Sequence, residues 1–66
     1  MKKKQLKKAI IKYLETVTHE KYLSHEIFKN DIYITTTGYD YYMTMEDLKD
    51  ELLNNNIITL KQYFKR

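Results

Sequence analysis

The sequence predicts a small α+β domain in which helices cover one face of a three-stranded antiparallel sheet, and three observations favour this class. Apolar side chains recur at helical spacing near the start of the chain and again after Thr44. Residues 32–43 alternate in the manner of strands on both sides of Gly38, the single glycine. A β-branched run begins at Ile57 and predicts a last strand. The expected order is therefore helix, helix, hairpin, helix, strand.

The first predicted helix has the clearest periodicity in the chain. Its apolar positions recur at steps of three and four residues, which places them on one stripe of an α-helix. On the opposite side Lys4, Lys8 and Lys12 repel one another and oppose the helix macrodipole. An anionic partner, or a solvated start of the chain, would each account for this unfavourable pattern. The apolar stripe consists of Leu6, Ala9, Ile10, Tyr13, Leu14 and Val17.

A short second helix is predicted over residues 24–30. Ser24 is a good N-cap, because its side-chain oxygen can accept a hydrogen bond from a free amide of the first turn. Ile27 and Phe28 would then point toward the core, and Asn30 and Asp31 would end the helix.

A β-hairpin is predicted to follow. Ile32 and Ile34 share one face of its first strand, residues 32–36, and Gly38 separates that strand from a second one over residues 39–43. Glycine fits the second position of a type I′ turn and the first position of a type II′ turn. The turn type and the strand register therefore stay open.

The third predicted helix has both of its ends marked in the sequence. Thr44 can accept a hydrogen bond from the amide three residues later, so the helix should begin at the next residue. Leu48 and Leu52 fall on its apolar face. The asparagines at 54–56 tolerate the left-handed conformation that ends helices. Residues 57–60 are then the last predicted strand, which could pair with the first strand of the hairpin.

Length and composition predict one domain with one small core. We expect the domain to span all 66 residues, with frayed ends at residues 1–4 and 64–66. The absence of cysteine leaves no disulfide and no thiolate metal site, and we expect no cofactor. No apolar run approaches the roughly 20 residues of a membrane span. Because the lysine-rich start also does not resemble a signal peptide, we expect a cytoplasmic protein without a membrane partner.

The net charge of +3 conceals two basic ends around an acidic middle. Residues 1–12 carry six lysines and no acid, and residues 57–66 carry two lysines and one arginine. Residues 31–56 carry six acids and one lysine. Opposite charges should therefore gather in separate patches on the folded surface.

The chain offers few catalytic groups, and we expect no enzymatic activity. His19 and His25 are six residues apart, which does not match the four-residue spacing of two metal ligands on one helical face. Ser24 has a nearer role as a helix cap than as a nucleophile. Asp47 and Glu51 lie on a predicted exposed helix face, where a catalytic pKa is hard to arrange. The sequence therefore predicts no catalytic residues and no metal site.

The first of two candidate binding surfaces is basic. It combines lysines of the first helix with the aromatic, basic end of the chain. Lysine and arginine neutralise phosphates and aromatic rings stack on bases, so this mixture suits nucleic acid. Alternatively, Tyr63 and Phe64 cover the edge of the core while the charges stay in water. The predicted nucleic-acid-binding residues are Lys4, Lys7, Lys8, Lys12, Lys61, Tyr63, Lys65 and Arg66.

The second candidate surface is acidic and rich in tyrosine. It joins the tip of the predicted hairpin to the exposed side of the third helix. Tyrosine gives a large contact area at low entropic cost and is enriched at protein interfaces. Some of the rings, Tyr41 in particular, could serve the core instead. The predicted protein-binding residues are Tyr39, Asp40, Tyr42, Glu46, Asp47, Asp50 and Glu51.

The order of the predicted elements resembles a winged helix-turn-helix domain. In YLSHEIF, Ser24 would open the second helix, and in MTMEDLKDELLNNNIITL, Thr44 would open the third. The apolar pair at residues 57–58 would lead into the wing. The resemblance implies a winged-helix-like fold and a DNA-associated regulator. The chain departs from the family because the third helix carries four acids against Lys49, and because few residues remain for a wing hairpin.

Two functional hypotheses follow from these surfaces. The first is a small regulator that contacts the phosphate backbone of nucleic acid through its basic first helix and tail, without reading sequence. The alternative is a protein-binding inhibitor or adaptor of the kind that phages and mobile elements provide. Its acidic tyrosine surface would meet a basic protein and could imitate the charge of nucleic acid. An exposed edge strand or the tyrosines could also support a homodimer.

Overall fold

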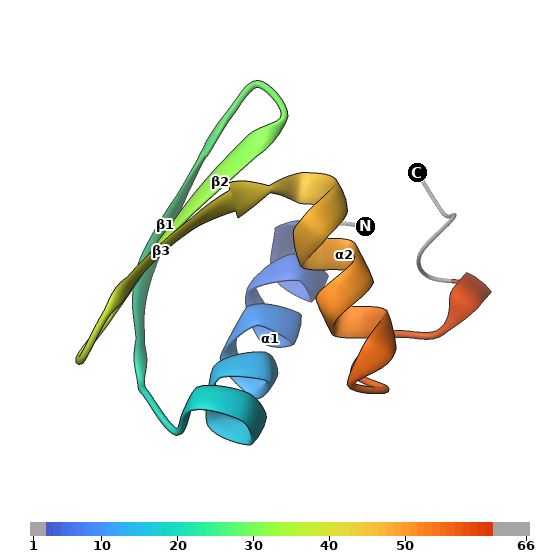
Figure 1. Ribbon diagram of the computed structural model, residues 1–66, viewed down its shortest axis with the longest axis horizontal. Helices are drawn as coiled ribbons and strands as arrows, with labels where there is room; N and C mark the ends of the chain where they lie inside the picture. Colours follow the sequence, from blue (N-terminus) through green and yellow to red (C-terminus); the bar gives the residue numbers. More distant parts are fainter. Residues whose placement is uncertain (1–2, 62–66) are drawn as a thin grey trace.

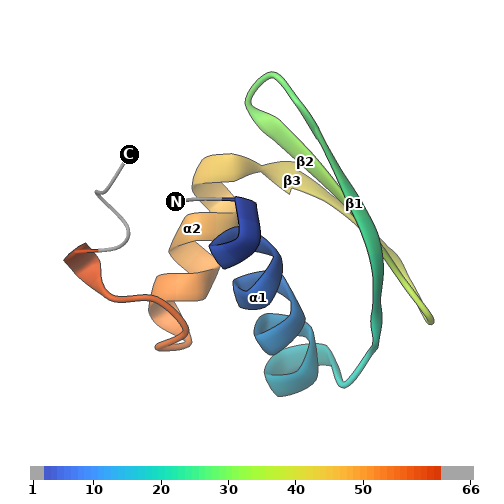
Figure 2. The same ribbon diagram turned by 180° about the vertical axis from the view of Figure 1, so that it is seen from behind.

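The computed structural model describes residues 3–61, in which two helices pack on one face of a three-stranded antiparallel sheet (Figure 1). The view from behind shows the same two layers (Figure 2). The predicted α+β class, with an antiparallel sheet covered on one face by helices, is therefore confirmed. The elements are helix α1 (Lys3–Tyr13), which continues into the π-helical turn η1 (Leu14–Thr18), strands β1 (Tyr22–Phe28), β2 (Asp31–Thr36) and β3 (Asp40–Thr44), and helix α2 (Met45–Asn54).

The core lies between the sheet and the two helices. Ile32 and Ile34 of β2 have no exposed surface, and the helical layer closes over them. Burying one such aliphatic side chain stabilises the fold by about 1.5–3 kcal/mol. The core consists of Leu6, Ala9, Ile10, Tyr13, Leu14, Ile32, Ile34, Leu48, Leu52 and Ile58.

Helix α1 presents the predicted apolar stripe to this core. Five of its six positions, from Leu6 to Leu14, are buried. Val17 is 42% exposed, because the wider π-helical turn of η1 rotates the stripe away from the core. The turn ends at His19, which has a left-handed conformation and donates its backbone N–H to the Leu14 carbonyl at 2.7 Å. Lys3 and Lys4, which were expected to fray, belong to α1. The rest of the expected frayed ends, residues 1–2 and 64–66, lies outside the described residues.

Helix α2 begins and ends where the sequence predicts. The hydroxyl of Thr44 accepts a hydrogen bond from the backbone N–H of Asp47 at 3.0 Å, so the helix starts at the next residue. At the other end Asn56 has a φ of 59°, and the N–H of Ile57 reaches the Leu52 carbonyl at 2.9 Å. These two features form a Schellman motif, which satisfies carbonyls that the helix end leaves free.

The strand predicted over residues 57–60 is not formed, which corrects the last expected element. After the Schellman motif, Ile58 enters the core with 5% of its surface exposed. Both edges of β2 are already taken by β1 and β3, so this segment has no place beside the middle strand. Leu60, the first residue of a further helical turn, is 62% exposed.

Strand β1 occupies the segment predicted as the second helix, which corrects the element order to helix, strand, strand, strand, helix. In the antiparallel pairing with β2, Ile27 lies opposite Ile32 and His25 lies opposite Ile34. This ladder satisfies backbone groups along β1, whereas an isolated helix of one or two turns is marginal in water. Phe28 is 55% exposed and does not point inward with Ile27, because neighbouring residues of a strand face opposite sides.

The same correction removes the basis of the winged-helix resemblance. Ser24, which would open the second helix, lies in β1 opposite Thr35. Within residues 3–61 no helix lies between η1 and α2. The described chain therefore does not form the pair of helices that a helix-turn-helix motif requires.

The predicted hairpin is formed by β2 and β3, with a three-residue loop in place of a two-residue turn. The φ of Gly38 is not positive, so the turn is neither type I′ nor type II′. Thr36, a polar residue with 6% of its surface exposed, organises the loop. Its hydroxyl oxygen accepts hydrogen bonds from the N–H of Tyr39 at 2.9 Å and of Gly38 at 3.3 Å.

The side chain of Glu20 lies close to Gly38. A Cβ atom at Gly38 would overlap the carboxylate of Glu20. That carboxylate is held in place, because it accepts hydrogen bonds from the hydroxyl of Tyr41 and, at 3.3 Å, from that of Thr36. The close approach ties the segment after η1 to the hairpin loop.

We expect Gly38→Ala to destabilise the fold by about 1–3 kcal/mol, because the new methyl group displaces the Glu20 carboxylate from its hydroxyl partners. Glu20→Ala should cost a similar amount. The double variant should be little worse than Glu20→Ala alone, since the clash is then absent. Urea unfolding of the three variants measures this coupling, and additive losses would contradict it.

Candidate functional site

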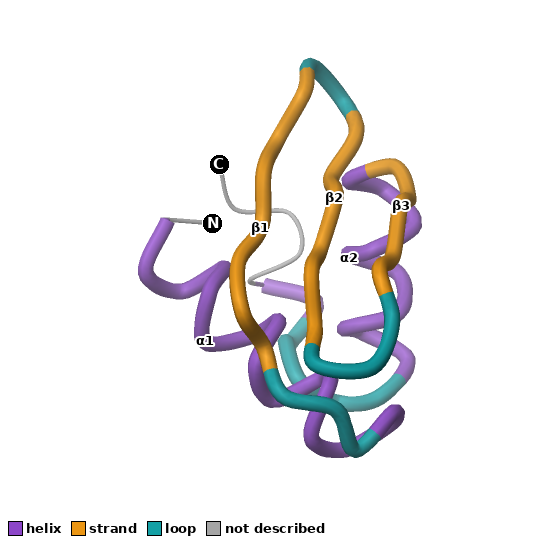
Figure 3. The backbone as a smooth tube through the Cα atoms, turned by 90° about the vertical axis from the view of Figure 1, so that its left-hand side faces the viewer, coloured by secondary structure: helices purple, strands orange, loops and turns teal. Residues whose placement is uncertain are grey.

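The face of the sheet opposite the helices is not covered by any described element (Figure 3). Because Ile32 and Ile34 are buried, the residues between and beside them in β2 point to this open face. Tyr33 lies there opposite Tyr42 of β3, with the two rings edge to face and their centroids 6.2 Å apart. The term aromatic face is used below for the side chains of Glu26, Phe28, Asp31, Tyr33, Asp40 and Tyr42 on this side of the sheet.

Two hydrogen bonds hold the tyrosine rings of the aromatic face. The hydroxyl of Tyr33 donates to Oδ2 of Asp40 at 2.8 Å, and the hydroxyl of Tyr42 donates to Oδ2 of Asp31 at 2.8 Å. Each bond favours the protonated phenol and is the main reason why the pKa of both tyrosines is raised. The rings are therefore held in place before any partner arrives, which lowers the entropic cost of binding.

The aromatic face is also acidic. Glu26 lies opposite Tyr33, and Asp31 lies opposite Phe28. Strands β1, β2 and β3 contain no lysine or arginine, so no cation within the sheet offsets these carboxylates. Exposed rings and negative charge therefore share one surface.

The structure divides the predicted acidic tyrosine surface between two layers. Asp40 and Tyr42 belong to the aromatic face, and Tyr42 is 64% exposed. The four predicted acids of α2 are exposed on the helical layer, on the other side of the sheet. One of them, Glu51, accepts a hydrogen bond from the buried Tyr13 at 3.4 Å and so links α2 to α1. Those acids are Glu46, Asp47, Asp50 and Glu51.

The remaining tyrosines of the hairpin have different roles. Tyr39 lies in the loop between β2 and β3 and is 66% exposed. Its ring packs against that of Tyr41, with 5.2 Å between the centroids. Tyr41 is half-buried against the core and donates its hydroxyl to Glu20, so it serves the fold.

The predicted basic surface is centred on α1. Lys4, Lys7, Lys8 and Lys12 are all exposed along this helix, and the structure pairs none of them with a carboxylate of the described residues. Lys61 is exposed beyond the end of α2. The other three predicted members of the surface, Tyr63, Lys65 and Arg66, lie outside the described residues.

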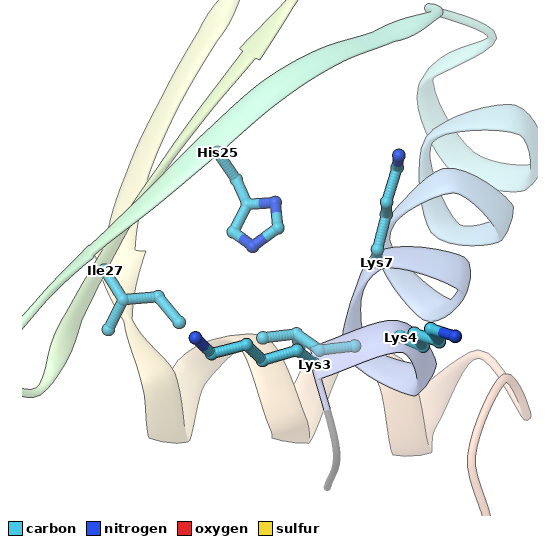
Figure 4. A pocket seen from close by; sticks show the side chains of 6 residues that line it. Lys3, Lys4, Lys7, His25 and Ile27 are labelled. Carbon is cyan, nitrogen blue, oxygen red and sulfur yellow. The ribbon is translucent and has the colours of Figure 1, made fainter.

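A groove that the sequence does not predict lies between the first turns of α1 and the inner side of β1 (Figure 4). Its volume is about 430 Å³. The ring of His25 points toward α1, and its Nδ1 lies 2.7 Å from the hydroxyl of Tyr22. The ammonium group of Lys7 lies 5.6 Å from the centroid of the Tyr22 ring. The α1–β1 groove, as it is called below, is lined by Lys3, Lys4, Leu6, Lys7, His25 and Ile27.

Sequence reasoning missed this groove because it assigned residues 24–30 to a helix. In a strand His25 and Ile27 share a face, whereas on a helix they do not. The available signal for a strand over residues 22–28 was the presence of Tyr22, Ile27 and Phe28, which are of the aromatic and β-branched types enriched in strands.

Among residues 3–61, no three histidine, aspartate or glutamate side chains gather in a way that could hold a metal ion. No helix of this part of the chain is both long enough and apolar enough to cross a bilayer. Comparison of the chain with protein-family models, with curated proteins and with solved structures finds no match.

We expect Tyr33 and Tyr42 to ionise above the ordinary tyrosine pKa of 10.0. Because the pKa is raised in the folded state, the two bonds stabilise the fold fully below that value, and their contribution is lost as the pH rises through the raised pKa. Asp40→Asn should lower the pKa of Tyr33 alone, and Asp31→Asn that of Tyr42 alone. Carbon NMR of the tyrosine rings separates the two titrations. Ordinary values for both rings in the wild-type protein would show that the bonds do not persist in solution.

Proposed function

We propose that the protein is a non-enzymatic binding module, an adaptor or inhibitor, whose aromatic face docks on a basic surface of a partner protein. The observation that carries this proposal is the pair of exposed tyrosines, Tyr33 and Tyr42, each bonded to an aspartate on an uncovered sheet face. Tyrosine is among the residues that contribute most to interface energies. A surface that combines such rings with carboxylates is suited to protein recognition.

The chemistry of the aromatic face favours arginine on the partner. Arginine pairs with carboxylates through two parallel hydrogen bonds and also stacks on aromatic rings. Asp31 and Asp40 offer the carboxylates, and the neighbouring tyrosine rings offer the flat surfaces. One arginine-rich patch could therefore use both kinds of group at once.

Nucleic acid is a poor partner for this face. Proteins that bind single strands through a sheet combine stacking rings with cations that follow the phosphates. Here carboxylates surround the rings and the strands contain no lysine or arginine, so phosphates would be repelled. The same charge pattern is consistent with a partner protein that has a basic surface of the kind that binds phosphates.

The test compares equal charge changes on the two layers. Asp31→Asn with Asp40→Asn removes two charges from the aromatic face, and Glu46→Gln with Asp47→Asn removes two from α2 as a matched control. A peptide of alternating arginine and serine serves as the probe in an NMR titration. We expect the sheet variant to lose about tenfold in affinity, the control to lose less than about twofold, and the amide shifts to lie in β2 and β3.

Replacement of Tyr33 and Tyr42 by serine separates ring contacts from simple charge attraction. We expect this variant to lose about as much affinity as the aspartate variant. Equal losses in the α2 control, or unchanged binding of the tyrosine variant, would overturn the proposal.

The exposed lysines of α1 support a second candidate function, contact with the backbone of nucleic acid. Lys4, Lys8 and Lys12 lie on the side of α1 away from the core, without a carboxylate partner in the described residues. Such a row of cations can neutralise phosphates and release their counterions. Within residues 3–61 no recognition helix accompanies the row, so these contacts would not read sequence.

Binding to duplex DNA should then weaken steeply with salt, with a slope of log K against log salt of about −0.9 for each phosphate contacted. Replacement of Lys4, Lys8 and Lys12 by glutamine should make this slope less steep by the amount that corresponds to about three phosphate contacts. Glutamine at Lys21, Lys29 and Lys49, which lie outside α1, is the control and should change it little. Fluorescence anisotropy at two salt concentrations measures the slope, and absence of binding at low salt would exclude this candidate.

A further inference from the structure

Strand β1 is one edge of the sheet, and its outer side has no partner strand among residues 3–61. It is seven residues long, whereas β3 at the other edge has five. An edge strand presents unpaired N–H and C=O groups that can pair with another extended segment. After an irregularity in the register between Tyr22 and Ser24, β1 pairs with β2 residue by residue up to Phe28. The outer side of this regular stretch is a template for a fourth strand.

Helix α1 lies under the place that a fourth strand would fill. Seen from the open face of the sheet, α1 extends past β1 beyond the edge (Figure 3). The α1–β1 groove opens there, and the side chains of His25 and Ile27 point from β1 toward α1 (Figure 4). Ile27 is 47% exposed although it lies on the inner side of the sheet. A strand added about 4.8 Å from β1 would cover this apolar surface.

The charge of the groove is one-sided. Lys3 and Lys7 are exposed at its rim, and Lys3 reaches across toward Ile27 (Figure 4). The first turn of α1 contains no acid, so the positive end of the helix dipole adds to these charges. Among the described residues, the groove lining contains no carboxylate. An occupant therefore needs negative charge as well as apolar side chains.

A second copy of this chain does not meet that need. Two β1 strands that pair antiparallel form one continuous sheet with both helical layers on the same side. Because α1 extends past β1, the two α1 helices would then approach each other with their lysines. Repulsion between these like charges opposes a dimer through β1.

We propose that the α1–β1 groove binds an extended acidic segment of a partner protein, which adds to β1 as a fourth strand. Backbone hydrogen bonds to β1 would supply affinity, and the inward side chains would supply specificity. These side chains are apolar where they meet Leu6 and Ile27, and acidic where they meet Lys3 and Lys7. The site is separate from the aromatic face and does not depend on its function.

The probe is the peptide Thr-Glu-Thr-Val-Thr-Glu-Thr, which is seven residues long, as β1 is. In an extended strand its two glutamates and its valine lie on the same side. NMR titration should shift the amides of β1 and slow their hydrogen exchange. Lys3→Glu with Lys7→Glu should weaken binding at least about tenfold. Lys8→Glu with Lys12→Glu, the matched control elsewhere on α1, should weaken it less than about threefold, because these lysines do not line the groove.

Two further controls make the result specific. A peptide with N-methylated backbone amides should lose binding, because it cannot pair with the edge of β1. Asp31→Asn with Asp40→Asn should leave the affinity unchanged, which distinguishes this site from the aromatic face. Equal binding of the methylated peptide, equal losses in the two lysine variants, or a β1-paired dimer in light scattering that the peptide does not dissociate would overturn the proposal.

Discussion

Burial of one face of β2 is the constraint on which the rest of the structure depends. Ile32 and Ile34 have no exposed surface, and each of the two helices brings one apolar stripe to cover them. A chain of this size can form only one such core, so all large aliphatic burial lies on one side of the sheet. The opposite side is left to side chains that tolerate water, which here are tyrosines, acids and Phe28. The aromatic face is thus a consequence of the layer arrangement as well as a candidate for binding.

Much of this arrangement is local and could be predicted from the sequence. The stripe of α1, the Thr44 cap, the Asn56 terminus and the alternation around Ile32 each depend on residues that are close in sequence. Strand β1 could not be predicted in this way, because its stability comes from pairing with β2, while Ser24 gave a strong local signal for a helix cap. Tertiary pairing overrode that signal. The failure of the strand predicted at 57–60 has the same origin, since β1 already occupies the edge that this segment would need.

The candidate surfaces were predictable in composition but not in geometry. The lysines of α1 are exposed as the helical period requires, yet the acids of α2 and the tyrosines of the hairpin belong to different layers. Strand register decides which rings are available for binding. Tyr41 shares the inner side with Ile34 and bonds to Glu20, while its neighbour Tyr42 faces outward and bonds to Asp31. A shift of one residue would exchange these two roles.

The start of α1 is where local chemistry and packing disagree most. Lysines oppose the dipole there, the first turn has no acid, and the α1–β1 groove leaves Leu6 and Ile27 beside an open space. The uncompensated positive charge and the uncovered apolar surface weaken the helix, and the same two properties suit an anionic, partly apolar partner. A carboxylate of the partner beside Lys3 and Lys7 would offset both the repulsion between the lysines and their unfavourable interaction with the helix dipole. An apolar side chain next to that carboxylate would complete the core. Departures from local structural preference are expected at functional sites. In this chain these departures lie together at the β1 edge of the sheet, which α1 extends beyond.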